Sequence, residues 1–258
     1  MELNIDGQLF VVCGASSGFG RAVTQTLLDE HARVIAVARR KEKLEDLRSA
    51  APDQCEIITG DLSREDTLEE IEHQVGDRNL TGLTLNSGGP PTGSAEHTTA
   101  EQWDAAYHSV FRWKTRLTGR LLPKMKAQNY GRILFIESAS IKQPIPNLAQ
   151  SNVMRAAIAG YVKTLSHEIA SHGVTANILA PGSHDTPAIE RVIESRKKDW
   201  NCSYDQARAT MEKNVPVGRF GKAEELASLA AWLLSDKSGY VTGQVISHDG
   251  GNISGLFG

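Results

Sequence analysis

Short β-rich runs alternate with helix-patterned segments along the whole chain of 258 residues. The seven runs are Leu9–Cys13, Arg33–Val37, Glu56–Thr59, Gly82–Asn86, Arg132–Glu137, Thr175–Ala180 and Gln244–Ser247. The segments between them, such as 21–30, 41–50, 67–75 and 152–171, carry apolar residues at helical spacing. This alternation favours a parallel sheet with helices on both faces, and right-handed crossovers make it doubly wound. The continuously apolar runs LFVVC and RVIAV are typical of strands buried on both faces.

One region, Ser183 to Val217, breaks the alternation. It predicts no strand, only a partly helical stretch before the regular helix at 222–234. In such a sheet, an excursion after the carboxyl end of a strand overhangs the ligand crevice. We interpret residues 183–217 as a substrate lid within one domain spanning 1–258, and a surface insertion without function is the alternative.

Composition excludes several classes of protein. The net charge of −3 and the pI near 6.3 give no field that would attract nucleic acid or an anionic membrane. Three cysteines at unrelated spacings, Cys13, Cys55 and Cys202, suggest neither a disulfide framework nor a metal site. The first residues lack the pattern of a signal peptide, and no run approaches the roughly 20 apolar residues of a membrane span. We therefore expect a cytoplasmic protein without a metal and without nucleic-acid or membrane partners.

A glycine-rich loop follows the first predicted strand directly and leads into a helix. It reads GASSGFG, from Gly14 to Gly20. Gly14 permits a sharp reversal, Gly18 lets the backbone approach a pyrophosphate, and Gly20 lets the helix pack closely on the sheet. Amide groups at the helix N-terminus favour an anion. The position of the loop between strand and helix predicts a dinucleotide site.

This loop resembles that of the short-chain dehydrogenase/reductase family, whose pattern is T-G-x-x-x-G-x-G, with Cys13 in place of the threonine. The resemblance continues through Asp61-Leu62, the NSGG segment from Asn86, Pro181-Gly182 with Thr186, and the C-terminal section from PVGRFG to HDGG. Together with NSGGPPTG, the segment KQPIPN at 142–147 is similar to a divergent branch described as 3-oxoacyl-carrier-protein reductase-like.

The resemblance implies a Rossmann fold with the seven strands in the order 3-2-1-4-5-6-7. It also implies which residues bind the nicotinamide cofactor. These are Gly14, Ser16, Ser17, Gly18, Phe19, Gly20, Arg39, Arg40, Asp61, Leu62, Asn86, Ser87, Gly88, Arg155, Pro181, Gly182 and Thr186.

The end of the second strand distinguishes NADP from NAD. An acidic side chain there would accept hydrogen bonds from the adenosine ribose, but Ala38 stands at this place and Arg39-Arg40 follow. Arg39 can bind a phosphate in bidentate fashion, so the sequence favours NADP over NAD. The alternative is that both arginines merely flank a solvated helix start.

The catalytic pattern of the family is only partly present. Ser138 matches the family's serine, but thirteen residues later stands Ser151 instead of tyrosine. Four residues further stands Arg155 instead of lysine, and Val110 takes the place of an asparagine. A serine hydroxyl is a poor substitute for a phenol as proton donor, whereas Arg155 can still bind the nicotinamide ribose but cannot lose a proton.

A replacement acid must therefore come from elsewhere. His184, two residues after Gly182, is a candidate because its pKa suits proton transfer. Lys142, Tyr107 and Tyr204 are further candidates, and each has an ordinary structural role as its alternative.

Two functions stay open at this point. The first is an NADP-dependent oxidoreductase that acts on a carbonyl or alcohol, with Ser138, Ser151, Arg155 and His184 as candidate catalytic residues. The second is an inactive NADP-binding regulator or scaffold on the same fold. Resemblance to the family also implies a homo-oligomer, a tetramer or dimer, formed through helices at 99–128 and 152–171 and the C-terminal strand.

Overall fold

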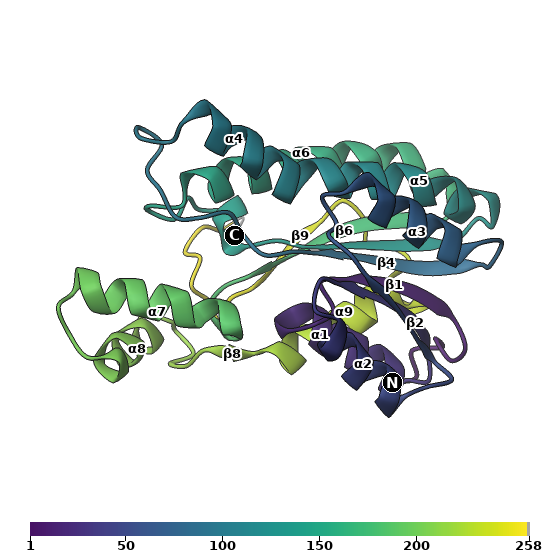
Figure 1. Cartoon of the computed structure of the whole chain (residues 1–258), viewed down its shortest axis with the longest axis horizontal. Coiled ribbons are helices and arrows are strands. Elements are labelled where there is room, and N and C mark those ends of the chain that lie inside the picture. Colours follow the sequence, from purple (N-terminus) through teal and green to yellow (C-terminus); the bar gives the residue numbers. More distant parts are fainter. Residues whose placement is uncertain (257–258) are drawn as a thin grey trace.

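A seven-stranded parallel sheet forms the centre of the computed structural model, which describes residues 1–256 (Figure 1). In spatial order its strands are β3 (Cys55–Thr59), β2 (Arg33–Ala38), β1 (Leu9–Cys13), β4 (Leu80–Asn86), β5 (Gly131–Ile136), β6 (Val174–Pro181) and β9 (Val245–His248). The order of these seven is the predicted 3-2-1-4-5-6-7, which confirms the Rossmann fold. Because every pairing is parallel, all carboxyl ends meet at one edge of the sheet.

Helices cover both faces of the sheet. In Figure 1 one layer lies above it and consists of α3 (Glu65–Val75), α4 (Ala100–Ala106), α5 (Trp113–Ala127) and α6 (Ala149–Ile169). The other layer lies below it and consists of α1 (Gly18–Asp29), α2 (Lys41–Ala50) and α9 (Ala223–Leu234). A π-helical turn, Tyr107–Arg112, joins α4 to α5.

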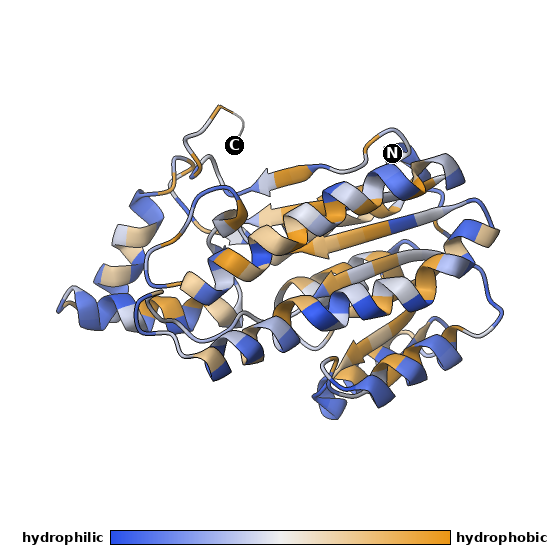
Figure 2. Cartoon of the chain, turned by 90° about the horizontal axis from the view of Figure 1, so that it is seen from above, coloured by the Kyte–Doolittle hydropathy of each residue, from blue (hydrophilic) through white to orange (hydrophobic). Residues whose placement is uncertain are grey.

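Two apolar cores, one on each face, hold these layers together. Leu117, Leu121 and Ile158 pack in one core, and Val23, Leu27 and Leu234 pack in the other. Figure 2 shows the result: the strands are largely hydrophobic and the outer faces of the helices are hydrophilic. Burial of β1 is complete along its length, as its apolar run LFVVC predicts.

The segment proposed as a lid contains two helices, α7 (Pro187–Asp199) and α8 (Tyr204–Lys213). They pack on each other through a small cluster around Ile193, Ala207 and Phe220, and extend beyond the sheet (Figure 1). The expectation that 183–217 contains no strand is wrong at one place. His184–Asp185 forms β7, which pairs in parallel with β8 (Gly221–Lys222), so the segments that enter and leave this lobe lie side by side.

Residues 1–256 lack two kinds of feature. No helix there has both the length and the apolar composition needed to cross a membrane. The same residues contain no group of three or more histidine, cysteine or acidic side chains placed to hold a metal ion.

Candidate active site

The glycine loop after β1 is held by close backbone contacts. Gly14 and Gly18 have positive φ angles of 71° and 52°, a region that favours glycine. A Cβ atom at Gly20 would lie 2.2 Å from the carbonyl oxygen of Gly14, and one at Gly14 would lie 2.7 Å from the carbonyl oxygen of Asn86. The loop therefore packs on the end of β4 at a distance that only glycine permits.

The N-terminus of α1 faces the space beside this loop without a competing anion. Ser17 caps the helix without a side-chain hydrogen bond, and the first turn holds no acidic residue. A phosphate group fits this environment, because unpaired amides and the helix dipole both favour negative charge.

Arg40 lies against the loop from the end of β2. Its guanidinium donates hydrogen bonds to Ser16 Oγ at 2.9 Å and to Ser17 Oγ at 2.6 Å. Arg39 is exposed and contributes positive charge near Asp61. A hydrogen bond from the Ser63 backbone N–H is the main cause that holds the pKa of the Asp61 carboxyl below its ordinary value. Both predicted arginines thus lie at this edge, but Arg40 bonds to the loop, and not Arg39, to which the sequence assigns the phosphate contact.

The predicted residues after β3 and β4 lie at the same edge. Leu62 packs against the core, whereas Asn86 contacts the glycine loop. The Ser87 hydroxyl is buried and has no hydrogen-bond partner among residues 1–256. A side chain at Gly88 would meet no atom within 4 Å, so the backbone at this position borders open space.

The end of β6 brings a pair of histidines beside the loop. His184 Nε2 lies 2.9 Å from His248 Nδ1, and His184 Nδ1 lies 3.1 Å from the Gly182 carbonyl oxygen. The Phe19 ring meets the His184 ring edge-on at 5.0 Å. His184 is only 3% exposed, and burial is the main cause that lowers its pKa.

Two further predicted residues complete this part of the edge. Pro181 pairs with His248 in the sheet. The Thr186 side chain lies 3.5 Å from the position of a Cβ atom at Gly18. The start of the lobe formed by α7 and α8 is therefore adjacent to the glycine loop.

Beyond β5, two of the predicted catalytic residues, Ser151 and Arg155, meet a buried group of charges. Arg155 Nε donates a hydrogen bond to Ser151 Oγ at 3.0 Å, one helical turn away on α6. Arg155 Nη1 donates to Glu137 Oε2 at 2.8 Å, and Lys114 Nζ donates to Glu137 Oε1 at 2.5 Å. Ser138 follows Glu137 and accepts a hydrogen bond from the Ser140 backbone N–H at 3.1 Å. Ser151 and Arg155 are thus in direct contact, and Ser138 is the residue that follows the carboxylate bound by Arg155.

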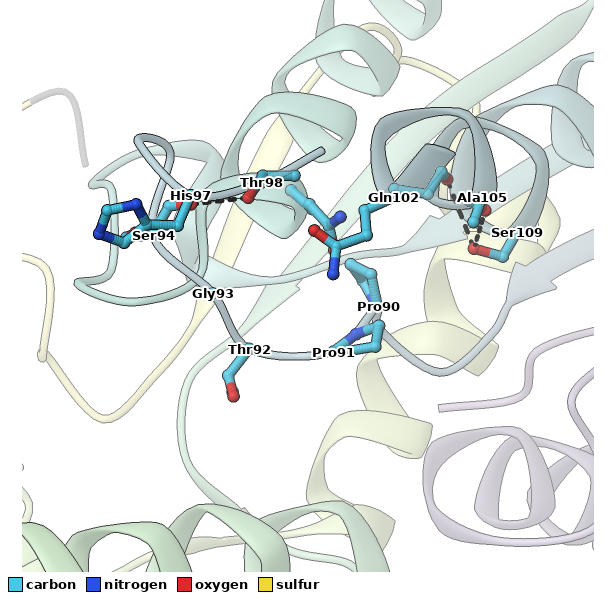
Figure 3. Close-up of a pocket in the computed structure, with 12 residues that line it drawn as sticks. Pro90, Pro91, Thr92, Gly93, Ser94, His97, Thr98, Gln102, Ala105 and Ser109 are labelled. Carbon is cyan, nitrogen blue, oxygen red and sulfur yellow. Dashed lines mark hydrogen bonds between the residues drawn. The ribbon is translucent and has the colours of Figure 1, made fainter. Parts of the chain in front are cut away.

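A small cavity of about 200 Å³ is lined in part by Gln150, the residue before Ser151 (Figure 3). Residues Pro90–Ser94 form one side and α4 forms another, with Gln150 from the start of α6. Figure 3 shows the Gln102 side chain extending from α4 toward Pro90 and Pro91. The cavity is smaller than the roughly 300–1,000 Å³ of typical ligand pockets, so it would admit only part of a ligand.

Comparison with known protein families identifies the chain. The family model described as enoyl-(acyl carrier protein) reductase matches residues 14–252. The chain belongs to the short-chain dehydrogenase/reductase family. This confirms the resemblance found in the glycine loop and the later motifs, and makes the chain an oxidoreductase of that family.

Several relatives align with nearly the whole length of this chain. The NADPH-dependent reductase BacG of Bacillus subtilis is 31% identical over 254 residues, which is 95% of this chain and 97% of the relative. The 3-oxoacyl-[acyl-carrier-protein] reductase FabG of Thermotoga maritima is 30% identical, over 96% of this chain and 99% of the relative.

Solved structures agree with the fold of this short-chain dehydrogenase/reductase. YwfH, an NADPH-dependent reductase involved in bacilysin biosynthesis, superposes with a TM-score of 0.91 at 28% identity, covering 97% of this chain and 100% of that one. L-sorbose reductase of Gluconobacter frateurii, in complex with NADPH and L-sorbose, gives a TM-score of 0.92 at 25% identity, covering 99% and 100%.

Sequence reasoning missed three residues of this short-chain dehydrogenase/reductase site: Lys114, Glu137 and His248. Glu137 did carry a signal, because it is a charged residue at the end of an apolar run, whereas Lys114 stands among other polar residues. Glu137 directly follows the apolar strand β5, and Lys114 lies one turn after the fully buried Val110. His248 carried no such signal, since its contact with His184 depends on the pairing of β6 with β9.

The other candidate acids have structural partners. Tyr107 stacks on Phe111, and Tyr204 packs in the cluster between α7 and α8. Both ring nitrogens of His184 already have partners within hydrogen-bond distance, which argues against its role as a free proton donor. Lys142 is half-buried at the end of the short helix after Ser138.

Proposed function

We propose that the chain is an NADPH-dependent reductase that acts on a carbonyl compound through an atypical active site. Arg40 is the observation that carries the cofactor preference. It extends from the end of β2, where Ala38 leaves no carboxylate, and its guanidinium bonds to both loop serines. A phosphate on the adenosine ribose would find the positive charge there that NAD does not need.

The residues around the loop support the remaining cofactor contacts. Gly14, Gly18 and Gly20 leave room for a pyrophosphate beside the N-terminus of α1, and Asp61-Leu62 lie where an adenine would pass. The backbone after β4 and the Pro181-Gly182 turn would border the nicotinamide. NADPH, when bound, would supply a hydride to the substrate carbon.

Ser138 and Arg155 support chemistry at the other end. Ser138 would orient the carbonyl oxygen, whereas Arg155, bonded to Ser151, stands where a tyrosine and lysine pair would be expected. The lobe formed by α7 and α8 would cover the substrate, since it begins beside the glycine loop. NADPH-dependent relatives such as BacG favour this function.

The first test is a fluorescence titration with NADPH and, separately, NADH. We expect wild-type protein to bind NADPH more tightly than NADH. Arg40→Gln should lower the affinity for NADPH about tenfold or more, because a charge-assisted contact is lost, and should change the affinity for NADH little. Arg39→Gln is the matched control and should have a smaller effect, since Arg39 does not contact the loop. Equal losses for both nucleotides in Arg40→Gln would contradict the phosphate contact.

A second function, an NADP-binding regulator without turnover, is favoured by one observation: Ser151 lacks a phenol and is already bonded to Arg155. A screen of aldehydes and ketones with NADPH separates the two functions. Turnover that falls in Ser138→Ala at unchanged NADPH affinity supports the enzyme. Tight NADPH binding without any turnover supports the regulator.

A further inference from the structure

Three ionisable side chains from three different elements meet inside the protein behind Ser151. They are Lys114 of α5, Glu137 after β5 and Arg155 of α6. The side chains of Lys114 and Glu137 are fully buried, and that of Arg155 is 7% exposed. Burying charge is costly unless it is paired, so a cluster of this kind needs a reason to persist.

The charges in this cluster do not balance. Glu137 gives one oxygen to each cation, so a single carboxylate faces two positive groups. Neither cation forms a second ion pair within residues 1–256. The nearby Cys13 adds no negative charge, because burial raises the pKa of its thiol. Burial first, and the Arg155 charge with it, lowers the pKa of Lys114, as expected for a cation without enough counter-charge.

Arg155 has donors left over. A guanidinium carries five N–H groups, and in Arg155 the contacts to Ser151 and Glu137 use two of them. Its Nη2 points toward the backbone after β4, where a Cβ atom at Gly89 would lie 3.5 Å away. Because Gly89 has no side chain, no Cβ atom covers Nη2 on that side.

We propose that Arg155 binds the oxygen of the reacting carbonyl and stabilises the oxyanion formed there, with Glu137 and Lys114 as positioning residues. This rests on the proposed reductase function. NADPH, when bound, would supply the hydride to the carbonyl carbon; as the π electron pair moves to oxygen, Arg155 would hold the resulting alkoxide. Arg155 keeps its protons, so a water molecule would supply the proton that completes the alcohol, with hydroxide released to the solvent and NADP⁺ left.

The positioning residues have separate tasks. Glu137 fixes the Arg155 guanidinium on one side while Ser151 fixes it on the other, so that Nη2 is aimed toward the glycines. Lys114 occupies the second oxygen of Glu137 and restores a net positive charge to the cluster. A single cation paired with Glu137 would leave a neutral cluster and a weaker attraction for an oxyanion.

The test uses formate, a small planar oxyanion, as the probe. Specific binding raises the melting temperature with ligand concentration, so formate is titrated against chloride at constant ionic strength. The experiment uses the full chain, both free and saturated with NADP⁺. We expect formate to raise the melting temperature of wild-type protein, and the formate affinity derived from this rise to be about tenfold or more lower in Arg155→Gln. That variant leaves Lys114 and Glu137 as a one-to-one pair.

Lys114→Met and Arg116→Gln complete the design. Lys114→Met leaves Glu137 paired with Arg155, and we expect it to lower the affinity for formate less than Arg155→Gln does. In wild-type protein formate affinity should fall as the pH rises toward the lowered pKa of Lys114, which lies beside Glu137, Arg155 and Cys13. Lys114→Met should abolish this decline. Arg116→Gln removes an exposed cation from the same helix and should change nothing.

The proposal is overturned if formate stabilises wild-type protein no more than chloride does. An equal response in wild type, Arg155→Gln and Lys114→Met overturns it as well, and so does an equal loss in Arg116→Gln. Titration of each variant with NADPH keeps the two proposals apart. A protein that binds formate through Arg155 but not NADPH would contradict the reductase function and leave the oxyanion site standing.

Discussion

The glycine loop and the cluster around Glu137 lie at the same edge of the sheet, yet they depend on different parts of the chain. In the loop, the backbone determines the geometry: two left-handed glycines and a 2.2 Å approach that excludes a Cβ atom. In the cluster, three side chains from separate elements determine it. The loop retains the family's pattern, whereas the cluster occupies the place where that pattern fails.

This difference indicates which of the two regions tolerates substitution of its residues. A loop that needs glycine loses its geometry with one substitution, since every other residue adds a Cβ atom. A cluster of side chains can be rebuilt by substitution while strands and helices stay in place. The fold therefore keeps its cofactor end recognisable, even where the chemistry at the other end is altered.

Glu137 provides the largest expected effect. Glu137→Leu leaves Lys114 and Arg155 buried beside each other without a counter-ion, and should lower the free energy of unfolding by about 3–5 kcal/mol. Urea denaturation followed by circular dichroism measures this. The triple variant Lys114→Met, Glu137→Leu, Arg155→Met removes all three charges and should recover wild-type stability or exceed it. A triple variant as unstable as the single one would show that shape, and not charge, holds this region.

A substitution at Gly20 tests the role of the backbone in the glycine loop. Gly20→Ala places a methyl group on the Gly14 carbonyl, so the loop must shift, at a cost of about 1–3 kcal/mol in unfolding free energy. NADPH affinity should fall with it, because the amides that receive the pyrophosphate move. The control is Gly160→Ala on α6, where a Cβ atom meets nothing within 4 Å and alanine favours the helix. If Gly20→Ala binds NADPH as tightly as Gly160→Ala does, the loop does not bind the pyrophosphate as proposed.

Much of the fold could be predicted from the sequence, because it depends on local patterns. The apolar runs correctly predicted all seven strands of the sheet, and the Gly14–Gly20 loop predicted the turn between β1 and α1. The contacts of Lys114, Glu137 and His248 could not be predicted in this way. Each depends on residues 18 to 64 positions apart meeting across the sheet edge, and on the direction of a side chain. The short strand β7 was missed because two residues carry no periodicity.

His184 gives the smallest effect and tests whether the loop region also supplies chemistry. Burial lowers its pKa below the ordinary value of 6.5, so the unfolded chain takes up a proton more readily than the folded one. The stability that comes from keeping His184 neutral is complete above about pH 6.5 and is lost as pH falls toward the lowered pKa. His184→Gln should flatten the dependence of unfolding free energy on pH in this range, whereas His73→Gln, on the exposed side of α3, should keep it. If His184→Gln instead abolishes turnover and leaves the pH dependence of stability unchanged, His184 is the missing acid and the two halves of the site share the chemistry.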